Sequence, residues 1–116
     1  MKIGVIGCGY VFDHYMTTLA KHPRLDIAGV TDRNAERAAA VGACYGLRVY
    51  DSVDDILADD SIGIIANFTS IESHNAISTA ALKAGKHVYS EKPLVTDMKQ
   101  ARALAKLAAD KGLRLS

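Results

Sequence analysis

The segment Gly7-Cys8-Gly9 has the residue types and the position of a phosphate-binding turn. It follows the apolar run at residues 2–6 and precedes a helical pattern. A tight strand-to-helix turn selects glycine, and so does a backbone that a pyrophosphate must approach closely. The next helix would direct free N–H groups and its positive dipole end at the phosphate. We predict that a dinucleotide contacts Gly7, Cys8, Gly9, Tyr10 and Val11, although the same glycines suit a tight turn without a ligand.

Phe12 occupies the place of the third glycine of the dinucleotide-binding fingerprint. Close packing of the helix against the strand usually selects glycine or alanine at that place. We therefore expect either a helix that lies slightly farther from the strand or a ring that points elsewhere. In both cases we expect a weaker hold on the dinucleotide.

Asp32 comes at the end of the second apolar run, at residues 25–30. Its distance from the glycines is typical of the acid that binds ribose in dinucleotide-binding folds. A carboxylate there can accept hydrogen bonds from both ribose hydroxyls of the adenosine half, and it repels a 2′-phosphate. A turn or helix-capping role is the alternative for Asp32. Because Arg33 could stack on adenine or pair with a 2′-phosphate, NAD is favoured over NADP without excluding it.

The segment Ser90-Glu91-Lys92-Pro93 lies at the end of the fifth apolar run. Proline fixes its own backbone and restricts Lys92 to extended geometry, which would hold the ammonium group over a cleft. There Lys92 could hydrogen-bond a substrate hydroxyl or share in proton transfer. A solvated lysine in a loop before a helix is the alternative.

Short apolar runs alternate with helical patterns along the chain, which is typical of βα units and a parallel sheet. The predicted strands cover residues 2–6, 25–30, 48–50, 63–67 and 87–90, with the start of a sixth at 113–115. The first predicted helix covers residues 11–21, and the second covers residues 35–45, with Asn34 as its N-cap and Gly46 just after its end. A short helical turn follows Ser52. The last two predicted helices run from a capping box at Thr69 and Glu72 to Gly85, and from Thr96 to Gly112. Six such strands predict an α/β, doubly wound Rossmann sheet in the order 3-2-1-4-5-6. Its ligand would lie at the carboxyl ends of the strands, where the order reverses.

Composition limits the classes of partner. The 116 residues are 49% hydrophobic and 23% charged, with a net charge of +1, and we expect them to form one dinucleotide-binding domain. This balance gives no electrostatic reason to expect nucleic acid or an anionic membrane as partner, and no run approaches the ~20 apolar residues of a membrane span. Two cysteines without CxxC spacing favour a reducing, cytoplasmic setting and no metal site.

Three stretches resemble the Gfo/Idh/MocA oxidoreductases: VIGCG at residues 5–9, DRN at 32–34 and AGKHVYSEKPL at 84–94. The last stretch is the most specific, being close to the family's AGKHVxxEKPL signature. The resemblance implies an N-terminal Rossmann domain that binds NAD or NADP and a C-terminal α/β substrate domain. It also implies oxidation or reduction of a secondary alcohol on a sugar, polyol or related ring, with Lys92 contacting both substrate and nicotinamide ribose.

Further residues match the family at the end of the fourth strand. Asn67 and Phe68 match its backbone-contact position, while Thr69 and His74 match a Thr-Pro…His pattern in which Ser70 replaces the proline. His74 is expected near the nicotinamide, or else simply exposed on its helix. The resemblance thus implies cofactor contacts at Asn67, Phe68, Thr69, His74, Glu91 and Lys92, and a catalytic role for Lys92.

The family's substrate domain has no counterpart within residues 1–116. We therefore expect the chain to bind the cofactor without efficient turnover of a sugar or polyol, and we leave open whether it is an enzyme by itself. Two alternatives are a non-catalytic NAD(H)-binding sensor or regulatory module and a class I methyltransferase, which also has a glycine-rich first loop and an acid after its second strand. The uncovered edge of the sixth strand also leads us to expect a homo-oligomer.

Overall fold

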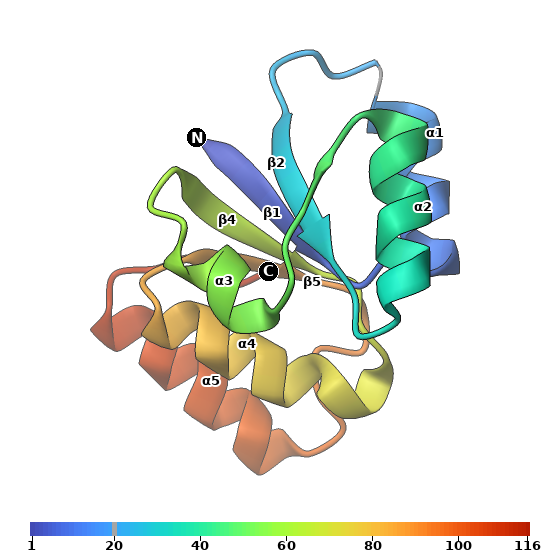
Figure 1. Cartoon of the computed structure of the whole chain (residues 1–116). Coiled ribbons are helices and arrows are strands. Elements are labelled where there is room, and N and C mark those ends of the chain that lie inside the picture. The colour runs from blue at the N-terminus through green and yellow to red at the C-terminus, as the bar shows by residue number, and fades with distance from the viewer. Residues whose placement is uncertain (20) are drawn as a thin grey trace.

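A five-stranded parallel sheet runs through the centre of the molecule (Figure 1). The structure is a computed structural model and describes residues 1–19 and 21–116. The strands are β1 (Lys2–Ile6), β2 (Asp26–Thr31), β3 (Arg48–Val49), β4 (Ile62–Asn67) and β5 (His87–Ser90). Their order β3-β2-β1-β4-β5 confirms the predicted doubly wound α/β fold. The predicted sixth strand is reduced to one parallel bridge, from Leu115 to Val88 of β5.

Helices cover both faces of the sheet. The helices are α1 (Tyr10–Leu19), α2 (Ala35–Tyr45), α3 (Val53–Ala58), the 3₁₀ turn η1 (Ile71–Ser73), α4 (His74–Lys83) and α5 (Met98–Asp110). In Figure 1, α1 and α2 lie together on one side of the sheet, and α4 and α5 lie on the other. In the part of the chain that the structure describes, no helix is long and apolar enough to cross a membrane.

The helix ends agree only partly with the sequence. The Asn34 side chain accepts a hydrogen bond from Arg37 N–H, and Gly46 ends α2 in the left-handed conformation (φ 65°), as predicted. The predicted capping box at Thr69 is wrong, because the Thr69 hydroxyl donates to Asn67 Oδ1 at 2.6 Å instead. The predicted cap at Thr96 is also wrong, since Asp97 caps α5.

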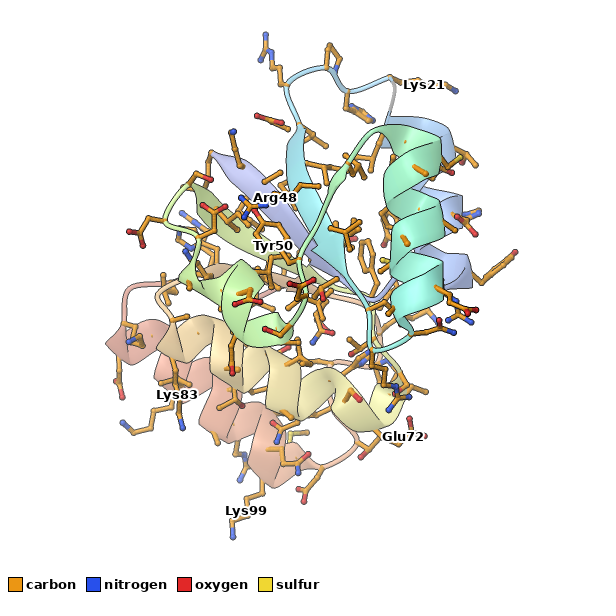
Figure 2. The ribbon with its side chains drawn as sticks, in the orientation of Figure 1. Lys21, Arg48, Tyr50, Glu72, Lys83 and Lys99 are labelled. Atoms are coloured by element: carbon orange, nitrogen blue, oxygen red, sulfur yellow. The ribbon has the colours of Figure 1, made fainter. Side chains whose placement is uncertain are left out.

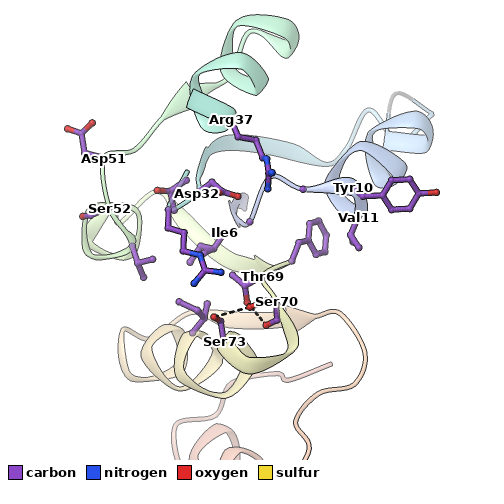
Figure 3. A pocket seen from close by; sticks show the side chains of 17 residues that line it. Ile6, Tyr10, Val11, Asp32, Arg37, Asp51, Ser52, Thr69, Ser70 and Ser73 are labelled. Atoms are coloured by element: carbon purple, nitrogen blue, oxygen red, sulfur yellow. Dashed lines mark hydrogen bonds between the residues drawn. The ribbon is translucent and has the colours of Figure 1, made fainter. Parts of the chain in front are cut away.

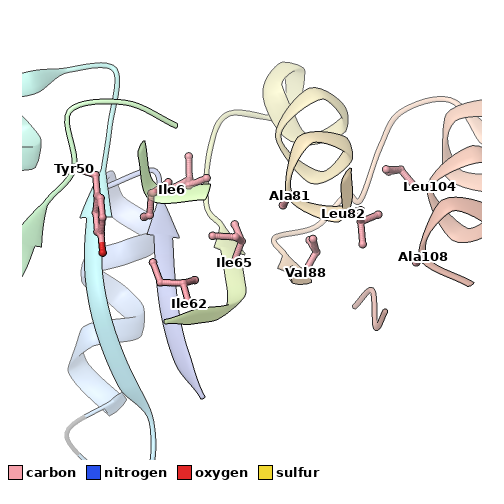
Figure 4. Packing of buried hydrophobic residues seen from close by; sticks show 10 residues of the cluster. Ile6, Tyr50, Ile62, Ile65, Ala81, Leu82, Val88, Leu104 and Ala108 are labelled. Carbon is pink, nitrogen blue, oxygen red and sulfur yellow. The ribbon is translucent and has the colours of Figure 1, made fainter. Parts of the chain in front are cut away.

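Alternate residues of the strands fill two apolar layers. Ile6 and Ile65 point into the layer under α3, α4 and α5, which Figure 4 shows with Leu82, Val88 and Leu104. Their neighbours Val5 and Ala66 point into the layer under α1 and α2. Full burial of each large apolar side chain contributes about 1.5–3 kcal/mol, so the two layers hold the strand ends in fixed positions.

Polar side chains connect the segments at the end of the sheet opposite the carboxyl ends of the strands. Arg48 lies over the Tyr50 ring, 4.4 Å from its centroid, and the Tyr50 hydroxyl donates to Asp59 Oδ2 at 2.6 Å (Figure 2). Lys86, which is only 5% exposed, donates from Nζ to the carbonyl oxygens of Asp59 and Ile62, both at 2.8 Å. The lysine of the AGKH stretch therefore ties the start of β4 to the start of β5.

Candidate functional site

A pocket of about 540 Å³ opens at the carboxyl ends of β1, β2 and β4 (Figure 3). Four segments line it: the end of β1 with the turn that leads into α1, the end of β2 with the start of α2, the loop after β3 with the start of α3, and the loop after β4 with the start of α4. It lies where the strand order reverses, between β1 and β4, which is the position at which doubly wound folds bind ligands. The predicted site residues on its wall are Gly7, Gly9, Tyr10, Val11, Asp32, Arg33, Phe68 and Thr69.

The two glycines of the turn meet different demands. Gly7 has φ +101°, and a Cβ at this position would lie 2.5 Å from the carbonyl oxygen of Phe68. The fold itself therefore requires glycine at position 7. A Cβ at Gly9, in contrast, would have only Arg37 Nη1 within 4 Å, at 3.8 Å. The backbone at Gly9 thus faces open pocket space, which is the room that a closely approaching diphosphate needs.

Helix α1 presents free amides to the same space. Its first i→i−4 bond runs from Asp13 N–H to Gly9 O, at 3.3 Å, so the amides from Gly9 to Phe12 precede the helical hydrogen-bond ladder. Gly9, Tyr10 and Val11 all line the pocket. Unpaired amides and the positive end of the helix dipole together favour an anionic group there. The residues present therefore fit the diphosphate of a dinucleotide.

Cys8 contributes to this turn through its backbone. Its N–H donates to Asp32 Oδ2 at 2.7 Å, while its thiol is buried and contacts Thr31 O at 3.7 Å. Burial raises the pKa of the Cys8 thiol to about 12, with the nearby Asp32 carboxylate adding to the effect. Cys8 is thus an inert packing residue under the pocket.

Asp32 has the turn role that the sequence left as an alternative. One carboxylate oxygen accepts from Cys8 N–H and the other from Asn34 N–H, each at 2.7 Å. These bonds tie the glycine turn to the start of α2. A carboxylate offers about four lone-pair positions, so two remain, and Asp32 is half-buried on the pocket wall. The turn role therefore leaves Asp32 able to accept hydrogen bonds from a ligand as well.

Phe12 does not block the pocket. The ring is fully buried in the apolar layer with Val5, Val30 and Ala66, and it packs edge-on against Tyr45 with centroids 5.7 Å apart. The expectation that the ring points elsewhere is correct, because the ring lies in the apolar layer under α1 and α2.

Asn67 and His74 lie behind the pocket wall. Fully buried Asn67 donates from Nδ2 to His74 O at 3.1 Å and to Ser78 Oγ at 2.9 Å. His74 is 1% exposed, so the alternative of a histidine exposed on its helix is wrong. Its Nδ1 lies 2.6 Å from Pro93 O and its Nε2 lies 2.9 Å from Thr69 O. The ring therefore joins the loop after β4 to the loop after β5.

The segment with Glu91 and Lys92 lies next to the pocket at the same edge of the sheet. Glu91 N–H donates to Asn67 O at 3.0 Å, and the Glu91 carboxylate accepts from the Tyr15 hydroxyl at 2.8 Å. The Lys92 side chain is exposed. Phe68, which lines the pocket, separates the two regions and stacks on the Tyr15 ring.

A family model described as the oxidoreductase family, NAD-binding Rossmann fold, matches residues 1–116. The chain belongs to the Gfo/Idh/MocA family. UDP-N-acetylglucosamine 3-dehydrogenase of Acidithiobacillus ferrooxidans is 38% identical to this Gfo/Idh/MocA chain over 117 residues, which cover 100% of the chain and 36% of the relative. Relatives of this kind support the resemblance seen in the AGKHVYSEKPL stretch.

Solved structures agree with this family. GenD2 from gentamicin A biosynthesis, in complex with NAD, is 31% identical with a TM-score of 0.94, and the match covers 100% of this chain and 33% of GenD2. Biliverdin reductase from Synechocystis, in complex with biliverdin and NADP⁺, is 28% identical with a TM-score of 0.90, over 98% of this chain and 36% of the reductase. This Gfo/Idh/MocA chain thus has the NAD-binding Rossmann fold of an oxidoreductase and spans about a third of the length of these relatives.

Arg37 and Tyr15 had no motif to identify them as part of this region. Arg37 of α2 lines the pocket, and Figure 3 shows it directed toward the glycine turn. Tyr15 of α1 holds Glu91. A signal for Arg37 existed, since an N-cap at Asn34 puts this arginine in the first turn of α2, close to the end of β2. Among the described residues, no group of three or more His, Cys, Asp or Glu could hold a metal ion.

Proposed function

We propose that residues 1–116 form a dinucleotide-binding domain that holds NAD in this pocket. In our proposal the domain is the cofactor half of an enzyme that oxidises or reduces a secondary alcohol on a sugar, polyol or related ring. The open space over Gly9 carries the proposal, because it lies beside the free amides of α1 and within reach of Arg37. A diphosphate placed there would receive N–H donors from the backbone and a guanidinium charge from one side.

Asp32 would select the adenosine ribose. Its two remaining lone-pair positions would accept the ribose hydroxyls, and its charge would repel a 2′-phosphate. Arg33 and Arg37 line the same pocket and could pair with such a phosphate, so NADP is the second cofactor that the site could accept. We propose NAD as the preferred one because the carboxylate is held in place by two backbone amides.

Lys92 would hold the substrate. Bound NAD would supply the hydride acceptor or donor at its nicotinamide ring. The chain's own contribution would be an ammonium group that donates a hydrogen bond to the substrate oxygen and stabilises negative charge on it. The A. ferrooxidans relative is named as a dehydrogenase of a nucleotide sugar, which supports a sugar or a related ring as the substrate. We propose that residues 1–116 alone bind cofactor without efficient turnover, because hydride transfer needs a substrate held in a water-excluding site.

Fluorescence titrations of the purified chain with NADH and, separately, with NADPH test this function. We expect saturable NADH binding that Arg37→Gln weakens by about tenfold, equivalent to one charge-assisted hydrogen bond. Arg102→Gln, an exposed arginine on α5, is the matched control and should leave the affinity unchanged. A wild-type chain that does not bind NADH would overturn the proposal.

A second measurement separates the enzyme from a non-catalytic NAD(H) sensor. A protein that contains this domain together with a substrate domain should form NADH on a panel of sugars and polyols. NADH binding without turnover on any of them would favour the sensor.

We also propose a homo-oligomer and a reducing, cytoplasmic setting. Among residues 1–19 and 21–116, the pairing of residues 114–116 is with β5 on one side, through Val88 N–H to Arg114 O and Ser90 N–H to Ser116 O. Pairing of the other side with a second copy would satisfy its backbone groups. Sedimentation that gives a monomer at high concentration would contradict the oligomer. Cys8 and Cys44 are both free thiols, which suits a reducing compartment.

A further inference from the structure

Three aromatic rings from distant parts of the chain meet beside the pocket. Tyr15 of α1 stacks on Phe68, which follows β4, with centroids 4.6 Å apart and planes 9° from parallel. Tyr89 of β5 meets both rings edge-on, at 6.1 Å from Tyr15 and 6.4 Å from Phe68. Phe68 also lines the pocket, so this aromatic cluster lies between the pocket and the Glu91–Pro93 segment. The proposed cofactor site and Lys92 are therefore connected through packed rings.

The Tyr15 hydroxyl has two polar partners in this cluster. It lies 2.8 Å from Glu91 Oε1 and 2.9 Å from the Tyr89 hydroxyl. An ionised carboxylate only accepts hydrogen bonds, and a phenol has one proton to donate. Tyr15 therefore donates to Glu91 and accepts from Tyr89. The hydrogen bond with Tyr89, burial and the nearby Glu91 carboxylate all raise the pKa of Tyr15 well above its usual range. Tyr15 consequently keeps its proton, and remains a donor, throughout the neutral pH range.

The Glu91–Pro93 segment is fixed at both of its ends. Besides the bond from Tyr15, Glu91 donates from its backbone N–H to Asn67 O at 3.0 Å. At the other end, Pro93 O lies 2.6 Å from His74 Nδ1. Lys92 stands between these anchors with an exposed side chain. The direction of the Lys92 side chain is therefore set by a backbone that three other elements hold.

We propose that Tyr15 is a positioning residue for Lys92. The Tyr15 hydroxyl holds the Glu91 carboxylate, and so ties α1, whose first turn lines the cofactor pocket, to the segment that carries Lys92. The proposal rests on the proposed function for the importance of Lys92, whereas the tether itself is a property of the chain. Of the three anchors, only the one from Tyr15 connects the segment to the helix that would hold the diphosphate.

Amide hydrogen exchange and backbone relaxation, measured by NMR on the 116-residue chain without cofactor, test the tether. Tyr15→Phe keeps the ring on Phe68 and removes the hydroxyl, and with it the bond donated to Glu91 and the bond accepted from Tyr89. We expect the Glu91 amide to exchange about five- to tenfold faster, the ratio that loss of one net hydrogen bond produces. The Lys92 amide should also become more mobile. Tyr45→Phe, an exposed tyrosine on α2, is the control and should change neither measurement.

Variants of the acceptor complete the test. Glu91→Ala removes the same hydrogen bond from the other partner and should reproduce the faster exchange, even if Tyr15→Phe fails to fold. Glu91→Gln keeps an acceptor oxygen and should restore slow exchange to within about threefold of wild type. Exchange and mobility at residues 91 and 92 that are the same in Tyr15→Phe, Glu91→Ala and wild type would overturn the tether. The NADH titration is separate: if wild type does not bind NADH but the exchange differences appear, the proposed function fails and the tether stands.

Discussion

The variant Gly9→Ala tests whether glycine at position 9 is needed for folding or for binding of the dinucleotide. The added methyl group would have Arg37 Nη1 as its nearest neighbour, at 3.8 Å, which is an ordinary van der Waals contact. Gly9 is not among the glycines with positive φ, so alanine can adopt its backbone conformation. At such compatible positions alanine stabilises a fold by about 0.4–1 kcal/mol, because it restricts the unfolded chain. The variant should therefore fold at least as well as wild type.

Binding of NADH should respond in the opposite direction. The methyl group would occupy space that a phosphate oxygen needs in order to accept from the amides at the start of α1. Loss of one hydrogen bond to a charged group costs about 1.5–3 kcal/mol. We therefore expect the dissociation constant for NADH to rise about ten- to hundredfold, measured by fluorescence titration beside a thermal melt.

Gly7→Ala is the matched comparison. Its Cβ would lie 2.5 Å from Phe68 O, on a backbone with φ +101°, so this variant should melt far below wild type or fail to fold. A Gly9→Ala chain that melts like wild type and binds NADH within about twofold of the wild-type affinity would refute the placement of the diphosphate over Gly9.

Three other perturbations have separable outcomes. Asp32→Asn should weaken NADH binding about tenfold. It should also raise the affinity for NADPH relative to NADH, because the charge that repels a 2′-phosphate is gone. Parallel titrations with the two nucleotides measure both effects. Lys86→Met should lower the free energy of unfolding by about 2 kcal/mol in urea titrations, because the buried carbonyl of Ile62 and the partly buried carbonyl of Asp59 lose their donor, and should leave NADH affinity unchanged. At pH 8 iodoacetamide should modify exposed Cys44 and spare Cys8, because burial raises the pKa of the Cys8 thiol to about 12 and its reactive thiolate forms only as the pH rises toward that value. Mass spectrometry of native and urea-unfolded chain checks this, and equal labelling of both cysteines in the native chain would contradict it.

The strands and the glycine turn could be predicted because their signals are local. The strands β1 (Lys2–Ile6) and β5 (His87–Ser90) have the predicted bounds. For β1 the reason is that the part of a parallel strand that is buried on both faces is a continuous apolar run. The turn at Gly7 follows directly from the first run. Its φ of +101° is a property that glycine alone meets easily.

The helix starts were predicted wrongly where nearby residues compete for the capping role. Thr69 has the residue type of an N-cap, but the buried side chain of Asn67 offers its hydroxyl a partner at 2.6 Å and draws it away from the helix. At α5, Thr96 and Asp97 are adjacent residues of similar capping preference, so the sequence could not choose between them. Both errors concern competition between partners, which residue types alone do not resolve.

Residue types also do not reveal which side of the pocket wall a residue occupies. Asn67, His74 and Cys8 were expected at the cofactor, yet each has its side chain buried behind the wall, and Asn67 and His74 hydrogen-bond the loops after β4 and β5. A polar side chain that is fully buried has to find partners within the protein, and the backbone of a loop supplies them. Asn67 and His74 fix the loops that carry Phe68 and Lys92. Their presence in a family motif therefore fits a role in positioning these loops and does not require contact with a ligand. Residues that line the pocket and residues buried behind its wall should therefore differ when they are substituted. A substitution of Arg37 should alter the affinity for the cofactor directly. A substitution of His74 should alter it by shifting the loops after β4 and β5.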